Sequence, residues 1–251
     1  MSKLEELQKK IKSFADPEKA KILQRFFKTG KGQYGEGDIF FGLVVPIQRE
    51  ISKSFTDLSL VDLQKLIKSK IHEERMITLF ILIQKYKKAR LRQEATAGES
   101  SVAKAMAGEA EKKKYFDFYL KNVKYINNWD LVDLSAPNIV GDYLSDKPRK
   151  ILYEMAKSEH LWTKRVSILA TFIFIKNNDF KDSLRIAQIL IHDEHDLIHK
   201  AVGWMLREVG KRDLAVLDEF LQDKYHKMPR TMLRYAIEKM EEKKRKKYLA
   251  K

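Results

Sequence analysis

A tryptophan and an aspartate stand four residues apart in the stretch NNWDLVDLSAP (127–137). On a helix, this spacing places Trp129 and Asp133 on one face, a single turn apart. A carboxylate can stabilise the positive charge that spreads over a sugar when an N-glycosidic bond breaks, and it can position or deprotonate the attacking water. Indole faces attract cations and pack against sugars and bases. The pair is therefore a candidate for glycosidic-bond chemistry.

A second acid, Asp130, competes with Asp133 for this role. Asp130 falls in the first turn after Asn127 and Asn128, where a carboxylate favours the amino end of a helix. Asp133 lies one turn deeper and level with Trp129. We therefore assign the chemistry to Asp133 and a helix-terminal role to Asp130.

The three tryptophans each have a charged residue three or four positions away, and their spacing along the chain adds to this pattern. A single tryptophan at helical spacing is ordinarily part of a core, and this holds for any one of the three. Trp129, Arg165 and Trp204, however, are 36 and 39 residues apart. In a chain of helical repeats, equivalent positions of successive repeats line up on one face. Arg165 can bind a phosphate in a bidentate manner, so the three residues and Asp133 predict a shared site.

Two further motifs carry little chemistry. The glycines of TGKGQYGEGDIFFGL (29–43) match G-x-G-x-x-G, but a dinucleotide fingerprint needs a preceding strand, whereas a helical pattern precedes this one. We read it as a flexible connection.

His192, His195 and His199 could share a helical face as metal ligands. HDEHD reads instead as a turn in which Asp193 or Asp196 caps the next helix, so we expect no metal.

Helical periodicity dominates the elements that must position these residues. Apolar residues recur at intervals of three and four in the segments 76–88, 114–123, 149–157, 164–176, 182–191, 197–211, 214–223 and 232–240. Prolines and polar turns separate these segments. No stretch alternates like a half-buried strand, so the sequence predicts an all-α fold.

The helices also form a degenerate repeat. Aligning the basic residue that opens each buried helix gives Arg75, Arg165, Lys200 and Arg230, with last intervals of 35 and 30 residues. Such a period predicts a right-handed α-solenoid of HEAT-like repeats with a concave basic face. The 90-residue first interval holds an insertion (92–112) rich in Ala, Gly, Ser and Glu, which we expect to be a flexible loop or a helical extension. We expect a single domain over 1–251.

Fifty Lys and Arg residues against 35 Asp and Glu point to a polyanionic partner. The tail KMEEKKRKKYLAK (239–251) contributes five of the fifteen excess positive charges, and the remaining ten are spread over the body of the chain.

The chain has no cysteine, which excludes disulfides and thiolate metal sites. The amino-terminal stretch has no secretory apolar region, and VSILATFIFI (166–175) is too short to cross a membrane. We expect a cytoplasmic location, associated with the nucleoid through a nucleic-acid partner, or the nucleus in a eukaryote.

In several segments the sequence resembles the DNA alkylation repair family, the AlkD-type DNA glycosylases built from HEAT-like repeats. The matching segments are FFKTGKGQYGEGDIFFGLVVPIQRE (26–50), NNWDLVDLSAPNIVGDYL (127–144), LWTKRVSILATF (161–172), HKAVGWMLREVGKRD (199–213) and HKMPRTMLRYAIEK (226–239). Together they span nearly the whole chain except 92–112.

The resemblance implies a role for each candidate residue. Asp133 would be the catalytic carboxylate, and Trp129 and Trp204 would be aromatic walls around the sugar of the damaged nucleotide. Arg165 would contact the DNA backbone near the lesion, and Arg207, one turn after Trp204, would be a further phosphate contact. The implied substrates are purines alkylated at N3 or N7, such as 3-methyladenine and 7-methylguanine, in double-stranded DNA. Those bases are already cationic, so the family needs no general acid.

These inferences predict a monofunctional glycosylase of base excision repair, monomeric and without a cofactor, that leaves an abasic site. No lysine is placed beside Asp133 in a way that indicates a Schiff-base lyase. The alternative is a non-catalytic HEAT-like scaffold that binds DNA or RNA structures. The Trp129–Asp133 pair separates the two, because a pure binder gains nothing from a carboxylate that faces phosphates. A third reading, a protein–protein solenoid, leaves the positive charge unexplained.

Overall fold

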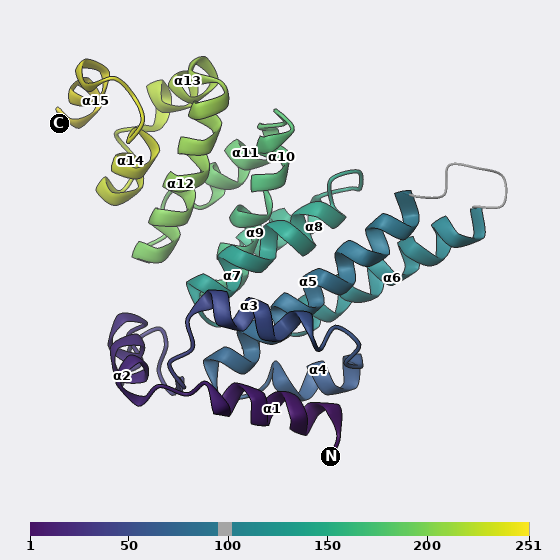
Figure 1. Ribbon diagram of the computed structural model, residues 1–251. Helices are drawn as coiled ribbons and strands as arrows, with labels where there is room; N and C mark the ends of the chain where they lie inside the picture. Colours follow the sequence, from purple (N-terminus) through teal and green to yellow (C-terminus); the bar gives the residue numbers. More distant parts are fainter. Residues whose placement is uncertain (95–101, 251) are drawn as a thin grey trace. The chain divides into compact units, whose positions relative to one another are not determined.

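The computed structural model describes residues 1–94 and 102–250, and the elements within them are helices (Figure 1). They are α1 (Lys3–Ser13), α2 (Pro17–Phe26), α3 (Val45–Lys53), α4 (Leu60–Leu66), α5 (His72–Glu94), α6 (Val102–Lys121), η1 (Val123–Tyr125), α7 (Trp129–Ala136), η2 (Pro137–Gly141), α8 (Lys150–Ala156), α9 (Leu161–Ala170), α10 (Phe172–Lys176), α11 (Lys181–Ile189), α12 (Asp196–Arg212), α13 (Leu214–Lys224), α14 (Arg230–Ala236) and α15 (Glu242–Leu249). Extended pairing in these residues is limited to an isolated bridge between Ile39 and Ile71. The predicted all-α class is confirmed.

The chain divides into two compact units, Met1–Leu131 and Val132–Lys251. In the first unit, α5 forms the centre, because α1, α3, α4 and α6 all pack against it. The run Met76–Ile83 on α5 is buried on every side of the helix. A helix that is apolar all round is stable only when it is enclosed by others. This is the reason for the central place of α5.

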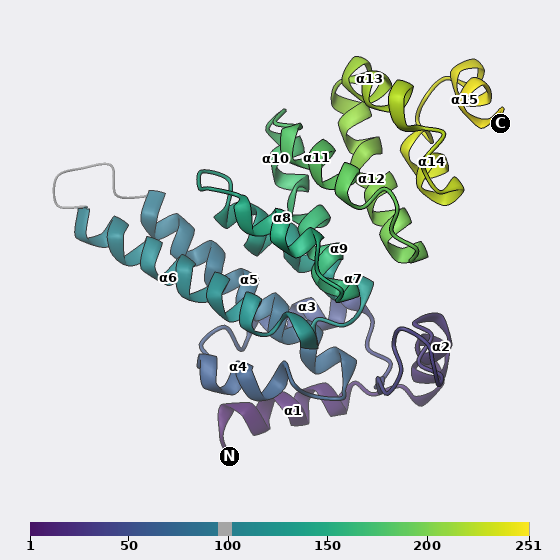
Figure 2. The ribbon, with the colours of Figure 1, turned by 180° about the vertical axis from the view of Figure 1, so that it is seen from behind.

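Helices α5 and α6 lie side by side as a long hairpin (Figures 1 and 2). The predicted insertion 92–112 lies at its end. Residues 92–94 belong to α5 and 102–112 to α6, so the helical extension is the correct reading for them. Gly108 allows close packing here, because a Cβ on it would lie 2.8 Å from the carbonyl oxygen of Ala89. The rest of the insertion, 95–101, is outside the described residues.

The second unit contains helical repeats. Helices α9, α12 and α14 pack in succession, α9 on α12 and α12 on α14, while α8, α11 and α13 pack against this layer. Buried residues on α12 recur at three- and four-residue intervals: Ile198, Ala201, Val202, Met205, Leu206 and Val209. This stripe joins α12 to both neighbours. The predicted repeat is therefore present in this unit.

Helix starts correct one position of the predicted alignment. Helices α9, α12 and α14 begin at Leu161, Asp196 and Arg230, so successive repeats are 35 and 34 residues apart. Counted from these starts, Arg165 and Lys200 are equivalent, as predicted. The third equivalent residue is Arg234, however, and Arg230 lies one turn too early.

A π-helical turn follows α7. Pro137 cannot donate a backbone hydrogen bond, so the regular α-helical pattern is interrupted where it occurs, and η2 absorbs the interruption. Gly141 closes η2 against α9, because a Cβ there would lie 2.2 Å from the carbonyl oxygen of Ala170. This close approach requires glycine. It fixes the position of α9 relative to η2 within the second unit.

The basic tail ends the second unit as a helix. Residues Glu242–Leu249 form α15, and Arg230 donates to the carbonyl oxygen of Leu249 over 2.9 Å. Tyr248 is buried and donates to Asp218 over 2.5 Å. No helix in the described part of the chain combines the length and apolar content that a bilayer crossing requires.

Candidate active site

Trp129 opens α7 and belongs to an aromatic cluster in the first unit. Its ring stacks on Phe27 at a centroid distance of 5.2 Å and meets the edge of Phe26 at 5.9 Å. Its indole N–H donates to the Tyr34 hydroxyl over 3.2 Å. Trp129 is half-buried, whereas Phe26 is 61% exposed. The indole is thus held in one orientation beside an exposed aromatic ring.

Sequence reasoning did not pair these residues, because Tyr34 lies 95 positions before Trp129. The glycine-rich stretch that contains Tyr34 lacks the preceding strand of a dinucleotide site, and the sequence predicts a flexible connection there. The structure shows a loop that is tied down. The Glu73 carboxylate accepts backbone N–H bonds from Phe41, Gly42 and Leu43 over distances of 2.8 to 3.1 Å.

A buried charge network stands behind the aromatic cluster. His72 contacts Asp130 through Nε2 at 2.8 Å and Asp38 through Nδ1 at 3.4 Å. Arg75 donates to Asp38 over 2.6 Å and to the carbonyl oxygen of Ser69 over 2.7 Å. The His72 ring also stacks on Phe27, the same ring that stacks on Trp129. The network therefore supports the start of α7.

The charges in this network stabilise one another. Burial alone lowers the pKa of His72, but the charge of Asp130 and the hydrogen bonds with Asp130 and Asp38 outweigh burial, so the pKa rises above its ordinary value of 6.5. Burial raises the pKa of Asp38, but the His72 bond and the Arg75 charge outweigh it and lower the pKa. Both effects favour a protonated imidazole between two carboxylates.

Asp130 therefore does more than the sequence indicated. It lies in the first turn of α7, as predicted, but its carboxylate is buried and paired with His72 rather than simply facing the helix end. One sequence signal could have indicated this partner. The segment HEER (72–75) is charged but directly precedes the apolar part of a buried helix, so its charges need partners within the protein.

Asp133 lies one turn after Trp129 on α7 and forms a bidentate ion pair in the second unit. Arg165 donates from Nε and from Nη2 to the two carboxylate oxygens of Asp133, both over 2.8 Å. Its third nitrogen, Nη1, donates to the carbonyl oxygen of Leu197. The Arg165 side chain is 6% exposed and that of Asp133 is 16% exposed. The arginine is enclosed, and the carboxylate retains an accessible edge.

The geometry of Arg165 bears on its predicted role. A backbone contact requires guanidinium N–H groups that reach a phosphate, whereas all three nitrogens of Arg165 are committed within the protein. The structure therefore pairs the Arg165 guanidinium with Asp133 and leaves only 6% of the side chain exposed. Sequence spacing brought the two residues to one site, but it did not predict that they would pair with each other.

Trp204 and Arg207 lie on α12. Trp204 is half-buried, donates to Glu208 over 3.1 Å and faces the Phe172 ring at 6.1 Å. Arg207 is paired with Glu238, so its predicted phosphate contact would compete with this bond. Trp162, in contrast, is 4% exposed and belongs to the core.

The predicted turn HDEHD is present, but its capping residue differs. His195 is the N-cap of α12, and its Nδ1 accepts the N–H of Leu197 over 3.1 Å. Asp193, one of the two predicted caps, instead accepts the N–H of His195. Within the described residues, no group of three histidine or acidic side chains is arranged to hold a metal ion.

Comparison with known proteins identifies the family of the chain. Residues 7–240 match the family model described as DNA alkylation repair enzyme. A predicted DNA alkylation repair enzyme from Enterococcus faecalis has a similar fold, with a TM-score of 0.64 and 14% sequence identity over 91% of this chain and 97% of that one. No curated protein matches the sequence. The family match supports a role in DNA repair with DNA as the partner. On the extent of that match, the chain belongs to the DNA alkylation repair enzyme family.

Proposed function

We propose that the chain is a monofunctional DNA glycosylase that hydrolyses the N-glycosidic bond of purines alkylated at N3 or N7 in duplex DNA. The observation that carries the proposal is the Asp133–Arg165 pair. A carboxylate oriented by two hydrogen bonds of 2.8 Å, with 16% of its side chain exposed, can act on a sugar presented from solvent. The family match to DNA alkylation repair enzymes supports the substrate class.

The reaction proceeds through a sugar cation. An alkylated purine such as 7-methylguanine or 3-methyladenine carries a positive charge. When the bond from C1′ to the base nitrogen breaks, its electron pair goes to the base, which leaves as a neutral molecule. The sugar becomes oxocarbenium-like, and water then adds to C1′ and loses a proton, which yields an abasic site. Because the leaving base is neutral, no acid is needed to protonate it.

Asp133 is the residue we assign to this step. Its carboxylate stabilises the developing positive charge and orients the attacking water, whose proton it can accept. Arg165 keeps the carboxylate in place, so that little reorganisation is needed as the charge develops. In this role Arg165 is a positioning residue.

Trp129 and Trp204 are assigned to binding of the damaged nucleotide. Each is half-buried, and each has its indole N–H bonded to a neighbouring side chain, Tyr34 and Glu208 respectively. These bonds fix the planes of the rings, and an indole face attracts a sugar cation as well as packing against the sugar. Phe26, exposed beside Trp129, would extend the aromatic surface of Trp129.

The test is release of free base from methylated duplex DNA, followed as 7-methylguanine and 3-methyladenine. Asp133→Asn should bind duplex DNA like the original chain and lose roughly 10²- to 10³-fold in the rate of release. Asp223→Asn, an exposed residue on α13, is the matched control and should retain full activity. If the original chain binds DNA but releases no base, it is a DNA-binding scaffold and the proposal is wrong.

A further inference from the structure

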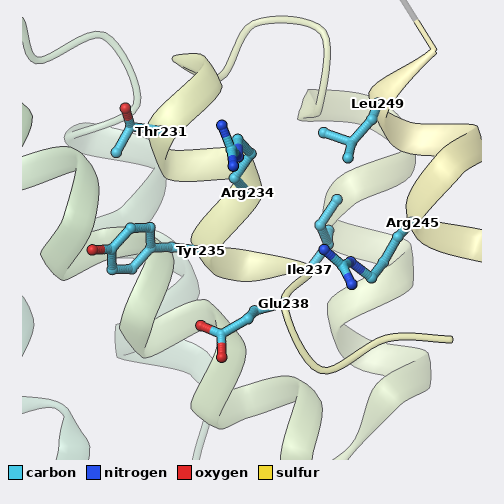
Figure 3. A pocket seen from close by; sticks show the side chains of 7 residues that line it. All are labelled: Thr231, Arg234, Tyr235, Ile237, Glu238, Arg245 and Leu249. Atoms are coloured by element: carbon cyan, nitrogen blue, oxygen red, sulfur yellow. The ribbon is translucent and has the colours of Figure 1, made fainter. Parts of the chain in front are cut away.

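A cavity of about 340 Å³ lies between α14 and α15 in the second unit (Figure 3). It is lined by Thr231, Arg234, Tyr235, Ile237, Glu238, Arg245 and Leu249. Figure 3 shows the side chains of Arg234 and Arg245 reaching the cavity from different parts of the chain. None of the seven residues belongs to the candidate active site.

Both arginines lack a protein partner. Across residues 1–94 and 102–250, the side chains of Arg234 and Arg245 have no hydrogen bond or ion pair. The Nε of Arg245 is enclosed by the protein and still has no acceptor. An enclosed donor without an acceptor carries an energetic cost. The cost is removed when a ligand supplies the acceptor.

The acid that lines the cavity does not neutralise these charges. Glu238 is paired with Arg207 and with Lys239, the latter at 3.2 Å. Its negative charge is therefore already matched by two cations outside the arginine pair. Two guanidinium charges in one hollow create a positive potential that attracts an anion.

Comparison of the helical repeats explains why Arg234 has no acidic partner among the described residues. Arg234 occupies the repeat position of Arg165 in α9 and Lys200 in α12, each four residues after the start of its helix. Arg165 is bound by Asp133, and Lys200 is bound by Asp196 at 2.7 Å. The third repeat keeps the cation and has no acid for it. At this position the protein leaves a guanidinium available to an external anion.

We propose that the cavity between α14 and α15 binds a phosphate group. Guanidinium groups match the oxygen pairs of a phosphate in a bidentate manner, and two of them suit its charge better than that of a single carboxylate. Ile237, Leu249 and the Tyr235 ring add apolar surface on which the rest of a nucleotide can rest. The phosphate can come from the DNA backbone or from a free mononucleotide. Only the first source rests on the proposed repair function.

The experiment compares the double variant Arg234→Gln/Arg245→Gln with the original chain. The first arm titrates deoxyadenosine 5′-monophosphate, with unphosphorylated deoxyadenosine as the probe control, by calorimetry. The second arm measures binding of an undamaged duplex over a series of salt concentrations. Lys243→Gln is the matched variant, because Lys243 is an exposed cation on α15 that does not line the cavity. Urea unfolding checks that each variant is folded.

Loss of mononucleotide binding by at least about tenfold in the double variant identifies a free nucleotide as the source; tenfold corresponds to about 1.4 kcal/mol. A fall of about 0.9 in the salt slope for each phosphate released identifies the DNA backbone. The proposal is overturned if the double variant matches the original chain in both arms, or if Lys243→Gln causes the same losses. Release of methylated bases by the original chain, compared with Asp133→Asn, tests the repair function separately, so the two failures can be told apart.

Discussion

The ion pair between Asp133 and Arg165 supports the most demanding prediction, because it must contribute to stability and to catalysis at once. The perturbation is a double-mutant cycle of Arg165→Ala, Asp133→Asn and the two combined. If Arg165 positions Asp133, the two changes must be coupled. If Arg165 acts only on DNA, their effects on the free energy of unfolding must be independent.

The geometry sets the size of the coupling. Removing one partner of a buried ion pair costs about 3–5 kcal/mol. Because 16% of the Asp133 side chain is exposed, water can reach the carboxylate left behind, so we expect the lower end, ~3 kcal/mol, for Arg165→Ala. Asp133→Asn keeps one acceptor for the guanidinium and should cost ~2 kcal/mol. With a coupling of ~2 kcal/mol, the combined variant should lose ~3 kcal/mol.

The assay is urea unfolding of the four proteins at neutral pH, together with duplex binding as a function of salt. A positioning arginine leaves the salt slope unchanged in Arg165→Ala while the rate of base release falls. A coupling energy below about 0.5 kcal/mol would refute the pairing, since distant, independent sites add within that margin. A slope reduced by about 0.9 would show instead that the guanidinium reaches a phosphate.

Three further perturbations test neighbouring parts of the account. His72 has a raised pKa, so its contribution to stability is complete below its ordinary value of 6.5 and is lost as pH rises through the folded-state value; urea unfolding over pH should show this loss, and His72→Gln should abolish it. Trp204→Ala should reduce base release and cost less stability than Trp162→Ala, which should cost about 3–5 kcal/mol; similar losses of stability in both would contradict the assignment. Gly141→Ala should destabilise the second unit by about 1–3 kcal/mol in thermal unfolding because its Cβ would meet a carbonyl of α9, and Gly30→Ala, which meets only a flexible side chain, should not.

The helices could be predicted from the sequence because they depend on periodic spacing. The pattern of α12 alone predicts its buried stripe. Intervals near one repeat predict a shared face for Arg165 and the motif at 127–137, and Arg165 is in contact with Asp133 of that motif. Spacing, however, predicts only which face of a helix a residue occupies. It could not say that the Arg165 guanidinium faces Asp133, because that depends on the depth of burial.

The rest of the site depends on contacts between distant segments. Tyr34 contacts Trp129 from 95 positions away in the chain, and His72 contacts Asp130 from 58 positions away. Asp38 is linked to the start of α7 through His72. The loop that carries Tyr34 is ordered by Glu73, an acid whose partners are backbone N–H groups. Such partners leave no pattern in the sequence. The same reason applies to Arg234, whose lack of an acid is visible only once the helix starts are known.

Release of 7-methylguanine and 3-methyladenine from methylated duplex DNA by the original chain and by Asp133→Asn tests the central claim most directly. We predict release by the original chain, and a rate lower by roughly 10²- to 10³-fold for Asp133→Asn with unchanged affinity for the duplex. Equal rates for the two proteins would contradict the role of Asp133, and no release by either would contradict the glycosylase itself.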